Sequence, residues 1–420
     1  MDALRATSAL GLAVMLLLAW LMSSDRRRFP WRVVLWGLAL QLALAALILR
    51  TGAGQAVFVQ IGRLFEALLG FVDHGSQFVF GAKYEEFYFA FKVLPTIIFV
   101  SSLMSVLYYL GLVQPVVQGM AWLMQRTLGT SGAETLAASA NVFMGQTEAP
   151  LVVRPYIPDM TVSELNAVMV GGFATISGGL IAVYAQWVPA AHLLTASVIS
   201  APAALLIAKI LEPETGRPAT LGTVTMSLPR RGTNVIEAAA IGATEGARLA
   251  INVAAMLLAF LALLALVDAC LRGVGSGVAW LGEHSAAQRD ILSGRQWSLA
   301  AALGYLFAPL AWLMGIEKGD CLRAGELLGL KMFATEFNAY AQLGQWERPD
   351  SGVQLSQRTV SILAYALCGF SNFASIGIQI GGLGGLAPER QSDLARLGLR
   401  AMLGGTLACL MTGCVAGLLV

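Results

Sequence analysis

Long apolar runs separated by short polar connections dominate the sequence. A helix needs about 20 apolar residues to cross the hydrocarbon core of a bilayer, and most of the runs approach or exceed that length. The pattern predicts an all-α polytopic membrane protein with nine candidate spans, of which one or two lie flat or cross only partly. The runs lie near residues 7–23, 31–50, 92–113, 163–187, 189–211, 249–272, 297–316, 357–383 and 393–419.

The segment 52–74 differs from these runs because Arg63, Glu66 and Asp73 recur among its aliphatic and aromatic residues. Mixed polarity at helical spacing suits a helix that lies in the membrane interface. We therefore expect an interfacial helix here rather than a tenth span.

Basic residues predict the topology. The cluster 25–32 and the connection 389–400 each carry several arginines beside spans, and the positive-inside rule places both in the cytoplasm. Both chain ends are then expected outside. The run 7–23 superficially resembles a signal peptide, but no small-residue cleavage pattern follows it, and we interpret it as a retained span.

Composition supports the membrane interpretation and excludes several functions. Of 420 residues, 57% are hydrophobic and 12% charged, with a mean hydropathy of +0.70, whereas soluble domains carry roughly 25% charged residues. A net charge of +2 provides no basic field for nucleic acid. The five cysteines lack CxxC spacing and the three histidines are far apart, so neither a disulfide framework nor a zinc site is expected.

One hydrophilic linker, 212–235, divides the chain into halves that resemble each other in outline. Each half has a proline-containing span, a short segment with a polar tip, a span broken by small polar residues, and a final span. Paired interrupted segments in matched order are typical of secondary transporters with inverted repeats. The polar tips lie at 145–148 and 335–338, and the breaks at 175–179 and 369–375.

This outline predicts five regions. We expect N-terminal spans and an interfacial helix that are mainly scaffold, a first transport repeat, the linker, central spans that are scaffold and line the site, and a second transport repeat. Their bounds are 1–125, 126–211, 212–235, 236–318 and 319–420.

Two glutamates, Glu148 and Glu336, occupy the polar tips. An ionisable group at membrane depth costs about 2.5 to 3.5 kcal/mol, so it needs a partner or a water-filled cavity. One alternative places both in the headgroup region as helix caps. We favour a binding site, because a half-helix N-terminus supplies free N–H donors that hold a carboxylate, Gln146 and Thr147 in fixed geometry.

Small and polar residues within the apolar helices predict two different roles. Glycine pairs at 171–172 and 404–405 are interpreted as packing devices, because small residues let helices approach closely. Asn372 and Ser375 stand three residues apart on one predicted helical face and offer donors and acceptors suited to vicinal hydroxyls.

A cation site also follows from the residue chemistry. Asn141 provides an amide oxygen and Thr175 a hydroxyl, while interrupted helices leave free carbonyls at Met144 and Ile176. Sodium prefers neutral, hard oxygens of this kind, and half-helix C-termini supply them.

The sequence resembles the concentrative nucleoside transporters. The resemblance rests on GQTEAPL at 145–151, Arg154-Pro155, ATISG at 174–178, LAINVAAMLLAF at 249–260, Glu336-Phe337 and CGFSNF at 368–373. It covers nearly the whole chain. It implies a homotrimer in the bacterial inner membrane, in which each protomer combines scaffold helices with a mobile domain of two re-entrant helical hairpins and two unwound transmembrane helices.

The resemblance also implies residue roles in sodium-coupled nucleoside symport. Gln146, Thr147 and Glu148 would face the nucleobase of a substrate such as uridine, with Leu180 and Leu249 packed on it. The ribose hydroxyls would be held by Glu336, Asn372 and Ser375, with Phe370 lining the site. Sodium, the co-transported ion, would be held by the Asn141 and Thr175 side chains and by the carbonyls of Met144, Thr175 and Ile176.

Departures from the family pattern leave two questions open. Thr335 and Asn338 replace the Asn and the small aliphatic residue that often flank the second glutamate, and Thr175 stands where serine is common. Selectivity and sodium affinity are therefore open, and a proton-coupled nucleoside symporter is the alternative. A membrane enzyme is not expected, because no Ser-His-Asp set, His-Glu metal motif or P-loop is present.

Overall fold

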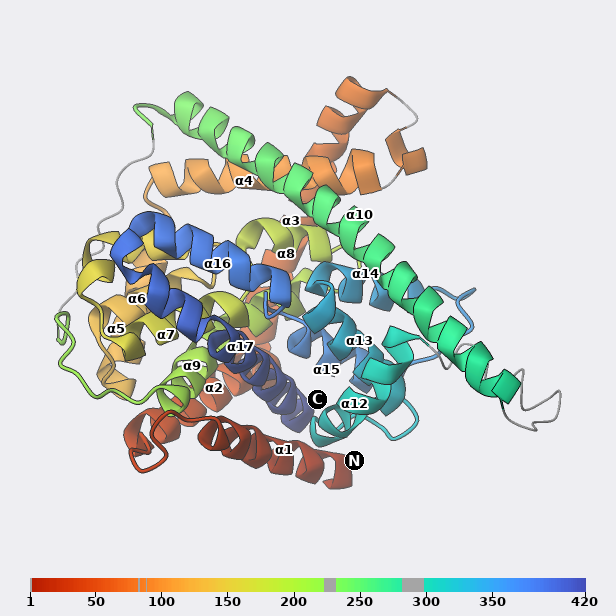
Figure 1. Ribbon diagram of the computed structural model, residues 1–420. Helices are drawn as coiled ribbons and strands as arrows, with labels where there is room; N and C mark the ends of the chain where they lie inside the picture. The colour runs from red at the N-terminus through yellow and green to blue at the C-terminus, as the bar shows by residue number, and fades with distance from the viewer. Residues whose placement is uncertain (1, 82–83, 88, 223–231, 282–297) are drawn as a thin grey trace.

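The computed structural model describes residues 2–81, 84–87, 89–222, 232–281 and 298–420, and all regular structure in these ranges is helical (Figure 1). The part before the linker contains α1 (Asp2–Leu21), α2 (Trp31–Arg50), α3 (Gly52–Phe80), η1 (Tyr84–Phe87), η2 (Phe89–Val93), α4 (Leu94–Tyr109), α5 (Gln114–Leu128), α6 (Gly132–Ala140), η3 (Ala149–Asp159), α7 (Val162–Ala174), α8 (Gly178–Tyr184) and α9 (Ala190–Leu211). The part after it contains α10 (Val235–Leu281), α12 (Leu299–Leu313), α13 (Cys321–Phe333), α14 (Glu336–Trp346), α15 (Gln357–Ala366), α16 (Phe373–Leu386), η4 (Pro388–Arg390) and α17 (Gln391–Leu419).

Eight helical segments in the described residues are long and apolar enough to cross a membrane, which agrees with nine candidates of which one or two cross only partly, but the choice of runs needs correction. The run 297–316 forms only the short helix α12, and 357–383 forms the two short helices α15 and α16. The segment 52–74 instead belongs to α3, which is long enough to span. Periodic polarity alone did not reveal that length, and the interfacial placement of α3 stays a prediction.

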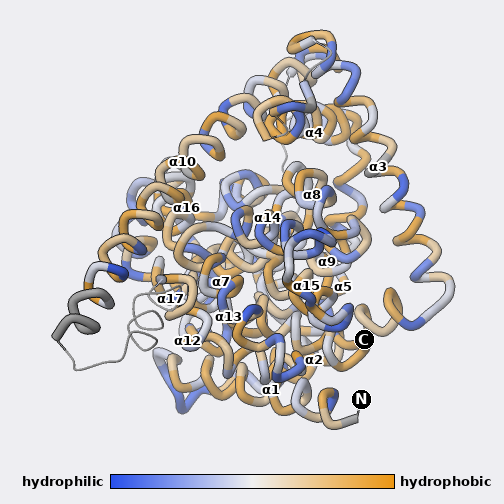
Figure 2. The backbone as a smooth tube through the Cα atoms, turned by 90° about the vertical axis from the view of Figure 1, so that its right-hand side faces the viewer, coloured by the Kyte–Doolittle hydropathy of each residue, from blue (hydrophilic) through white to orange (hydrophobic). Residues whose placement is uncertain are grey.

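The molecule has a compact body and an arch that leans over it. The arch is formed mainly by α4, which crosses the upper part of Figure 1, and α10, which runs diagonally from the upper left to the lower right across the view. In Figure 2, α4 lies in the upper part of the molecule, with α10 and α3 descending on either side of the body.

Small residues hold α4 and α10 in close contact. A side-chain carbon at Gly242 would lie 2.6 Å from the Ser101 carbonyl oxygen, so only glycine permits this approach. Across the same contact, the hydroxyl groups of Ser102 and Ser105 donate hydrogen bonds to backbone carbonyls of α10, over 2.9 and 2.7 Å. The arch is therefore a tightly packed pair.

The core of the body lies where α7, α9 and α17 pack together, and most residues of these helices there are buried. Gly404 and Gly405 lie against side chains of α7 and α9: a side-chain carbon at Gly404 would lie 2.6 Å from Leu211 Cδ1 and 3.0 Å from Val170 Cγ2. The structure confirms the packing interpretation of this pair.

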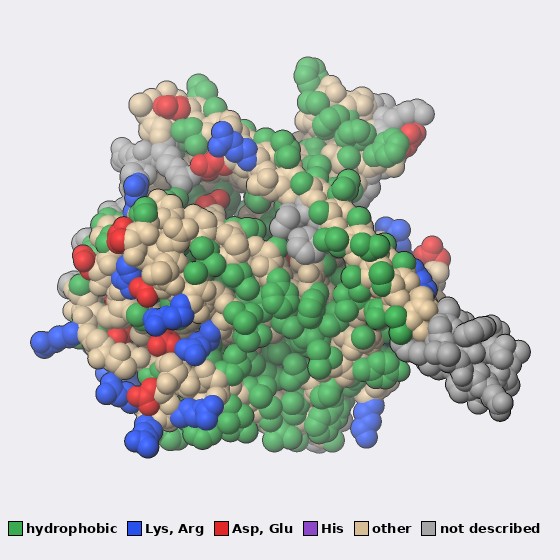
Figure 3. Space-filling model, in the orientation of Figure 1, with side chains coloured by type: hydrophobic (Ala, Val, Ile, Leu, Met, Phe, Trp, Pro, Cys, Tyr) green, Lys and Arg blue, Asp and Glu red, His purple; other side chains and the backbone are tan. Residues whose placement is uncertain are grey.

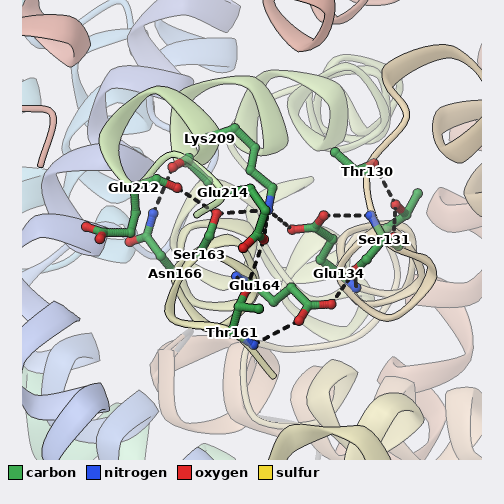
Figure 4. Close-up of polar contacts among 12 residues, drawn as sticks. Thr130, Ser131, Glu134, Thr161, Ser163, Glu164, Asn166, Lys209, Glu212 and Glu214 are labelled. Carbon is green, nitrogen blue, oxygen red and sulfur yellow. Dashed lines mark hydrogen bonds and ion pairs between the residues drawn. The ribbon is translucent and has the colours of Figure 1, made fainter. Parts of the chain in front are cut away.

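A buried polar cluster fastens the starts of α6 and α7 to the end of α9 (Figure 4). Ser131 and Thr161 each cap a helix N-terminus, and Glu134 and Glu164 complete the two capping boxes. The two boxes are joined because the Ser131 hydroxyl donates to Glu164 Oε1. We call this set the Lys209 cluster: Ser131, Glu134, Thr161, Ser163, Glu164, Lys209 and Glu214.

The surface agrees with a membrane protein. A broad hydrophobic face runs across the body in Figure 3, and charged side chains gather at the end of the body where α5 and α6 lie. Without a bilayer, apolar side chains would not be expected to dominate so wide an exposed face. The chain is an all-helical polytopic membrane protein.

Candidate functional site

A cavity of about 500 Å³ lies between the arch and the body, beside four helix interruptions. The interruptions separate α6 from η3, α7 from α8, α13 from α14, and α15 from α16. The nine residues predicted to bind substrate all line it: Gln146, Thr147, Glu148, Leu180, Leu249, Glu336, Phe370, Asn372 and Ser375.

Glu336 lies at the first position of α14, where the preceding residue, Thr335, caps the helix by accepting a hydrogen bond from the Asn338 N–H. The Glu336 side chain is buried. The Tyr184 hydroxyl donates to Glu336 Oε1 over 2.8 Å, and Asn372 Nδ2 donates to Oε2 over 2.9 Å. Two donors and the start of a helix thus stabilise a carboxylate inside the protein.

Aromatic residues hold Tyr184 in place behind this carboxylate. The Tyr184 ring stacks on Tyr340 with 4.8 Å between the ring centroids. The Tyr340 hydroxyl is itself fixed, because it donates to the Ala364 carbonyl over 2.8 Å. The donor to Glu336 is therefore rigidly positioned.

Asn372 does not share a helical face with Ser375 as predicted. It is the N-cap of α16, and its Oδ1 accepts the backbone N–H of Ser375 over 2.9 Å. The prediction was wrong on this point because asparagine at a break prefers to cap the following helix. Its oxygen is used within the protein, and its nitrogen is directed to Glu336.

The turn 141–148 brings an amide and a second carboxylate to the cavity. Gln146 Nε2 donates to the Ser375 hydroxyl over 3.3 Å, which links the turn to α16. Glu148 Oε2 accepts the backbone N–H of Gly145 over 3.3 Å, which closes the turn. The polar groups of the two halves of the chain therefore meet in one place.

The opposite wall is formed by α10 and α8. Leu249 and Leu180 provide apolar surface, while Glu245, Arg248 and Asn252 add polar groups on the same face of α10. A flat heteroaromatic ring would find apolar contact on this side and hydrogen-bonding groups on the other.

The residues predicted to bind a cation lie at two neighbouring interruptions. Asn141 ends α6, and Thr175 stands at the break between α7 and α8. The Gly178 N–H donates to the Phe143 carbonyl over 2.9 Å, so the two interruptions lie side by side. Met144 and Ile176 are buried on the same two segments.

The donor set suits sodium. Asn141 is fully buried, and neither its Oδ1 nor its Nδ2 has a hydrogen-bond partner among the described residues. The Thr175 hydroxyl donates its proton to the Gly171 carbonyl over 2.9 Å, which leaves its lone pairs for a cation. An unpaired buried amide oxygen is costly unless a ligand occupies it.

A second cavity of about 610 Å³ adjoins the first and shares Ser101, Glu148, Leu151, Ser177, Glu245 and Leu249 with it. Arg154, one of the residues that carry the family resemblance, lines this cavity together with Tyr108. The two cavities therefore lie next to each other along the α4–α10 arch.

Sequence reasoning missed several residues that shape the site. Tyr184 was not considered, although it lies one helical turn from Leu180 and so shares its face. Gln379 was missed in the same way, four residues after Ser375. The polar residues of α10 were also overlooked because an apolar run surrounds them.

The arrangement is suited to binding a polar organic molecule. The site offers a carboxylate, amides and hydroxyls that match the hydroxyls and ring edges of a polar organic molecule.

Family models match nearly the whole sequence. The model described as "Na+ dependent nucleoside transporter C-terminus" matches residues 192–417, and its N-terminal counterpart matches residues 10–83. A model described as "Nucleoside recognition" matches residues 90–191.

Characterised and uncharacterised relatives are similar over almost all of this chain. An uncharacterized transporter of Haemophilus influenzae is 44% identical, covering 99% of this chain and 97% of the relative. Human solute carrier family 28 member 3 is 43% identical over 97% of this chain. Sodium/nucleoside cotransporter 1 of Rattus norvegicus is 42% identical over 97%. The chain spans only 58 to 60% of the length of the solute carrier family 28 member 3 relatives.

Solved structures of the transporter CNTnw share the fold. The inward-facing, substrate-bound state is 42% identical, covers 99% of this chain and 98% of its own, and has a TM-score of 0.89. A variant of CNTnw in an outward-facing state is 41% identical, covers 100% of this chain and 98% of its own, and has a TM-score of 0.91.

Proposed function

The chain belongs to the concentrative, Na+-dependent nucleoside transporter family, and from this we propose that it carries nucleosides into the cell in symport with sodium. The observation that carries the proposal is the single cavity in which the turn 145–148 of the first half faces Glu336 and Asn372 of the second. Both the base and the sugar of a nucleoside find suitable groups there.

The ribose end is assigned to the buried carboxylate. Glu336 accepts from Tyr184 and Asn372 and keeps further lone pairs for the substrate. A carboxylate with free lone pairs binds two vicinal hydroxyls well, because both hydroxyls donate to it. Ser375 adds a hydroxyl on the same side, and Phe370 provides an apolar edge.

The nucleobase end is assigned to the turn and the apolar wall. Gln146, Thr147 and Glu148 provide hydrogen-bonding groups for the ring edge, and Leu180 and Leu249 pack on its faces. An enclosed polar edge with apolar faces favours a flat ring over a sugar or an amino acid.

Sodium is assigned to Asn141 and Thr175, with the carbonyls of Met144, Thr175 and Ile176. No hydrogen bond to the Met144 or Ile176 carbonyl is found among the described residues, whereas the Thr175 carbonyl also accepts the Phe370 N–H over 3.3 Å. Sodium held here orders the turn 141–148, which carries Gln146, Thr147 and Glu148. Ion and nucleoside binding then strengthen each other reciprocally.

Transport is proposed to occur by movement of the two transport repeats, 126–211 and 319–420, against a scaffold that includes the α4–α10 arch. The tight packing of that pair supports its role as a scaffold. Relatives solved in inward-facing and outward-facing states support alternating access. The two re-entrant hairpins are assigned to α6 with η3 and to α13 with α14.

The assembly is proposed to be a homotrimer in the bacterial inner membrane. Exposed leucines and isoleucines along α10, such as Ile251 and Leu258, support an apolar environment of lipid or neighbouring subunits. Chemical cross-linking in native membranes tests this, and a monomer or dimer as the largest product would contradict it.

The membrane potential contributes the free energy that concentrates the nucleoside inside the cell. A neutral nucleoside accompanied by one sodium ion moves one charge, worth about 2.3 kcal/mol per 100 mV. This corresponds to roughly fiftyfold accumulation. The cation therefore carries the energetic coupling.

Uptake of labelled uridine into proteoliposomes tests the function. We expect concentrative uptake with an inward sodium gradient, none with potassium alone, and release of chemically unchanged uridine. Equal uptake driven by a proton gradient without sodium would select the proton-coupled alternative. Absence of saturable uptake of any nucleoside would contradict the proposal.

A further inference from the structure

Gln379 on α16 is a buried polar residue that does not line the substrate cavity but contacts a residue that does. Its Nε2 donates to Gln146 Oε1 over 3.2 Å and to the Met169 carbonyl over 3.1 Å. These two bonds join the turn 145–148 to α7 and α16.

The Met169 carbonyl determines the direction of this hydrogen-bond chain. An amide side chain can present either oxygen or nitrogen, and its orientation follows from its partners. A backbone carbonyl only accepts, so the nitrogen of Gln379 must face Met169. Gln146 must then direct its oxygen to Gln379, and its nitrogen is left for Ser375 and the cavity.

The packing around this contact leaves space for the two amides and little else. A side-chain carbon at Gly172 would lie 2.7 Å from Gln379 Nε2 and 3.0 Å from Gln146 Cβ. Gly172 thus provides the room in which the two side chains meet.

Packing alone does not explain a glutamine here. Gln379 Oε1 has no hydrogen-bond partner among the described residues, and a buried unpaired oxygen is unfavourable. An apolar side chain of similar length avoids that penalty. Gln379 therefore contributes its two donated hydrogen bonds, to Gln146 Oε1 and to the Met169 carbonyl.

We propose that Gln379 is a specificity-positioning residue, which fixes the Gln146 amide so that its N–H, rather than its oxygen, is presented to the nucleobase. The inference rests on the proposed function, in which Gln146 faces the base. A base edge with a carbonyl oxygen accepts from that N–H, whereas an exocyclic amino group does not. Uridine, with a carbonyl where cytidine has an amino group, is the favoured pyrimidine.

The dissociation constants of uridine and cytidine, measured on purified protein in sodium, test the proposal. Gln379→Met removes both donated bonds and frees Gln146 to present either atom. We expect the preference for uridine to fall by about fivefold, the factor for one hydrogen bond of ordinary strength. An unchanged ratio of the two constants would overturn the proposal.

Gln379→Glu provides a second test, which predicts the direction of the change in base preference while the volume of the side chain stays nearly constant. As a carboxylate the introduced group only accepts hydrogen bonds, so it draws the nitrogen of Gln146 toward it, and Gln146 then presents its oxygen to the base. The preference should move toward cytidine, beyond the value for Gln379→Met. Movement toward uridine would contradict the proposed direction.

Gln41→Met is the matched structural control. Gln41 is also buried, donates one hydrogen bond, to Thr412 over 3.2 Å, and has an unpartnered Oε1 among the described residues. It lies outside the cavity lining, so its variant should keep the uridine to cytidine ratio of the unmodified protein. A ratio that changes equally in Gln41→Met and Gln379→Met would reduce Gln379 to a stability residue.

A double-mutant cycle separates positioning from direct contact. In a Gln146→Met background, Gln379→Met should cause no further change in the ratio, because the positioned amide is already absent. An independent, additive change would overturn the proposal. If the unmodified protein binds and transports no nucleoside, the proposed function itself fails; if it does and only the ratios behave otherwise, this inference alone fails.

Discussion

The ammonium group of Lys209 lies 2.6 Å from Oε2 of Glu134, and both side chains are almost completely buried. The same nitrogen donates to Ser163 Oγ over 2.9 Å and to Glu214 Oε2 over 3.2 Å (Figure 4). One cation therefore connects the start of α6, the start of α7 and the segment after α9. Because α6 leads directly to the substrate-facing turn, the Lys209 cluster is the anchor of that turn.

Lys209→Met should destabilise the protein strongly. The substitution leaves Glu134 buried beside Glu214 and Glu164 without its cation. Removing one partner of a buried ion pair costs about 3 to 5 kcal/mol. The thermal midpoint in detergent should fall by many degrees, whereas Lys318→Met, at an exposed position, should leave it nearly unchanged.

The loss should be partly recovered by neutralising the partner. Lys209→Met combined with Glu134→Gln removes both charges and should be more stable than Lys209→Met alone. If Lys209→Met alone were as stable as the unmodified protein, the Lys209 cluster would not be an anchor.

Glu336→Gln should weaken nucleoside binding by about tenfold or more, the range for a hydrogen bond to a charged group. Tyr184 and Asn372 both donate to the carboxylate, whereas an amide at this position has one oxygen and no charge, so it offers fewer lone pairs to these two groups and to the ribose hydroxyls. The dissociation constants of uridine, 2′-deoxyuridine and 3′-deoxyuridine should become more alike in the variant.

Tyr184→Phe is the control for Glu336. It removes one donor but keeps the charge of the carboxylate, so the discrimination between uridine and its deoxy analogues should be retained with a smaller loss of affinity. If Glu336→Gln discriminates among the three ligands as the unmodified protein does, the ribose assignment is wrong.

The sequence was informative where polarity interrupts an apolar helix. Gly145 to Glu148, Thr175 and Glu336 all stand out in this way, and the structure places helix ends at each of them. Local chemistry causes these breaks: Thr175 leaves α7 in an extended conformation, and Thr335 caps α14. Such causes act between residues that are close together in the chain, so the sequence alone can predict them.

The interactions that the sequence did not predict join residues that are far apart in the chain. Gln379 stands in an apolar run, and its partner Gln146 is 233 residues away. Lys209 looks like a basic residue at the end of a span, although Ser131 with Glu134 and Thr161 with Glu164 carry the spacing of capping boxes. The spacing predicts each box, but only the packing of α6 on α7 joins them.

Thr175→Val should weaken sodium binding. The change keeps the shape of the side chain but removes the hydroxyl oxygen. We expect the sodium concentration for half-maximal uridine uptake to rise by about fivefold, as for the loss of roughly 1 kcal/mol. The maximal rate at saturating sodium should change much less.

Thr195→Val is the matched control for this change. The Thr195 hydroxyl is buried and donates to the carbonyl four residues earlier over 2.6 Å, as the Thr175 hydroxyl does over 2.9 Å. It lies on α9, outside the proposed sodium site. An identical sodium requirement in Thr175→Val and Thr195→Val would exclude the Thr175 hydroxyl as a ligand.

Gly172→Ala should disturb base selectivity without adding any polar group. The new carbon would lie 2.7 Å from Gln379 Nε2 and 3.0 Å from Gln146 Cβ, so one of the two amides has to move. Gly172 is not among the glycines with positive φ, and backbone strain therefore does not contribute. The ratio of uridine to cytidine dissociation constants should shift in the same direction as in Gln379→Met.

Gly377→Ala, on the same helix as Gln379, distinguishes this contact from a general effect of alanine. No heavy atom outside its own helix and chain neighbours lies within 4 Å of the carbon added at Gly377. Replacing a glycine inside a helix by alanine stabilises it by up to about 1 kcal/mol. Gly377→Ala should therefore raise or keep the thermal midpoint and leave the ratio unchanged. If Gly172→Ala also leaves the ratio unchanged while the protein remains folded, the two amides tolerate displacement, and base selectivity does not depend on their alignment.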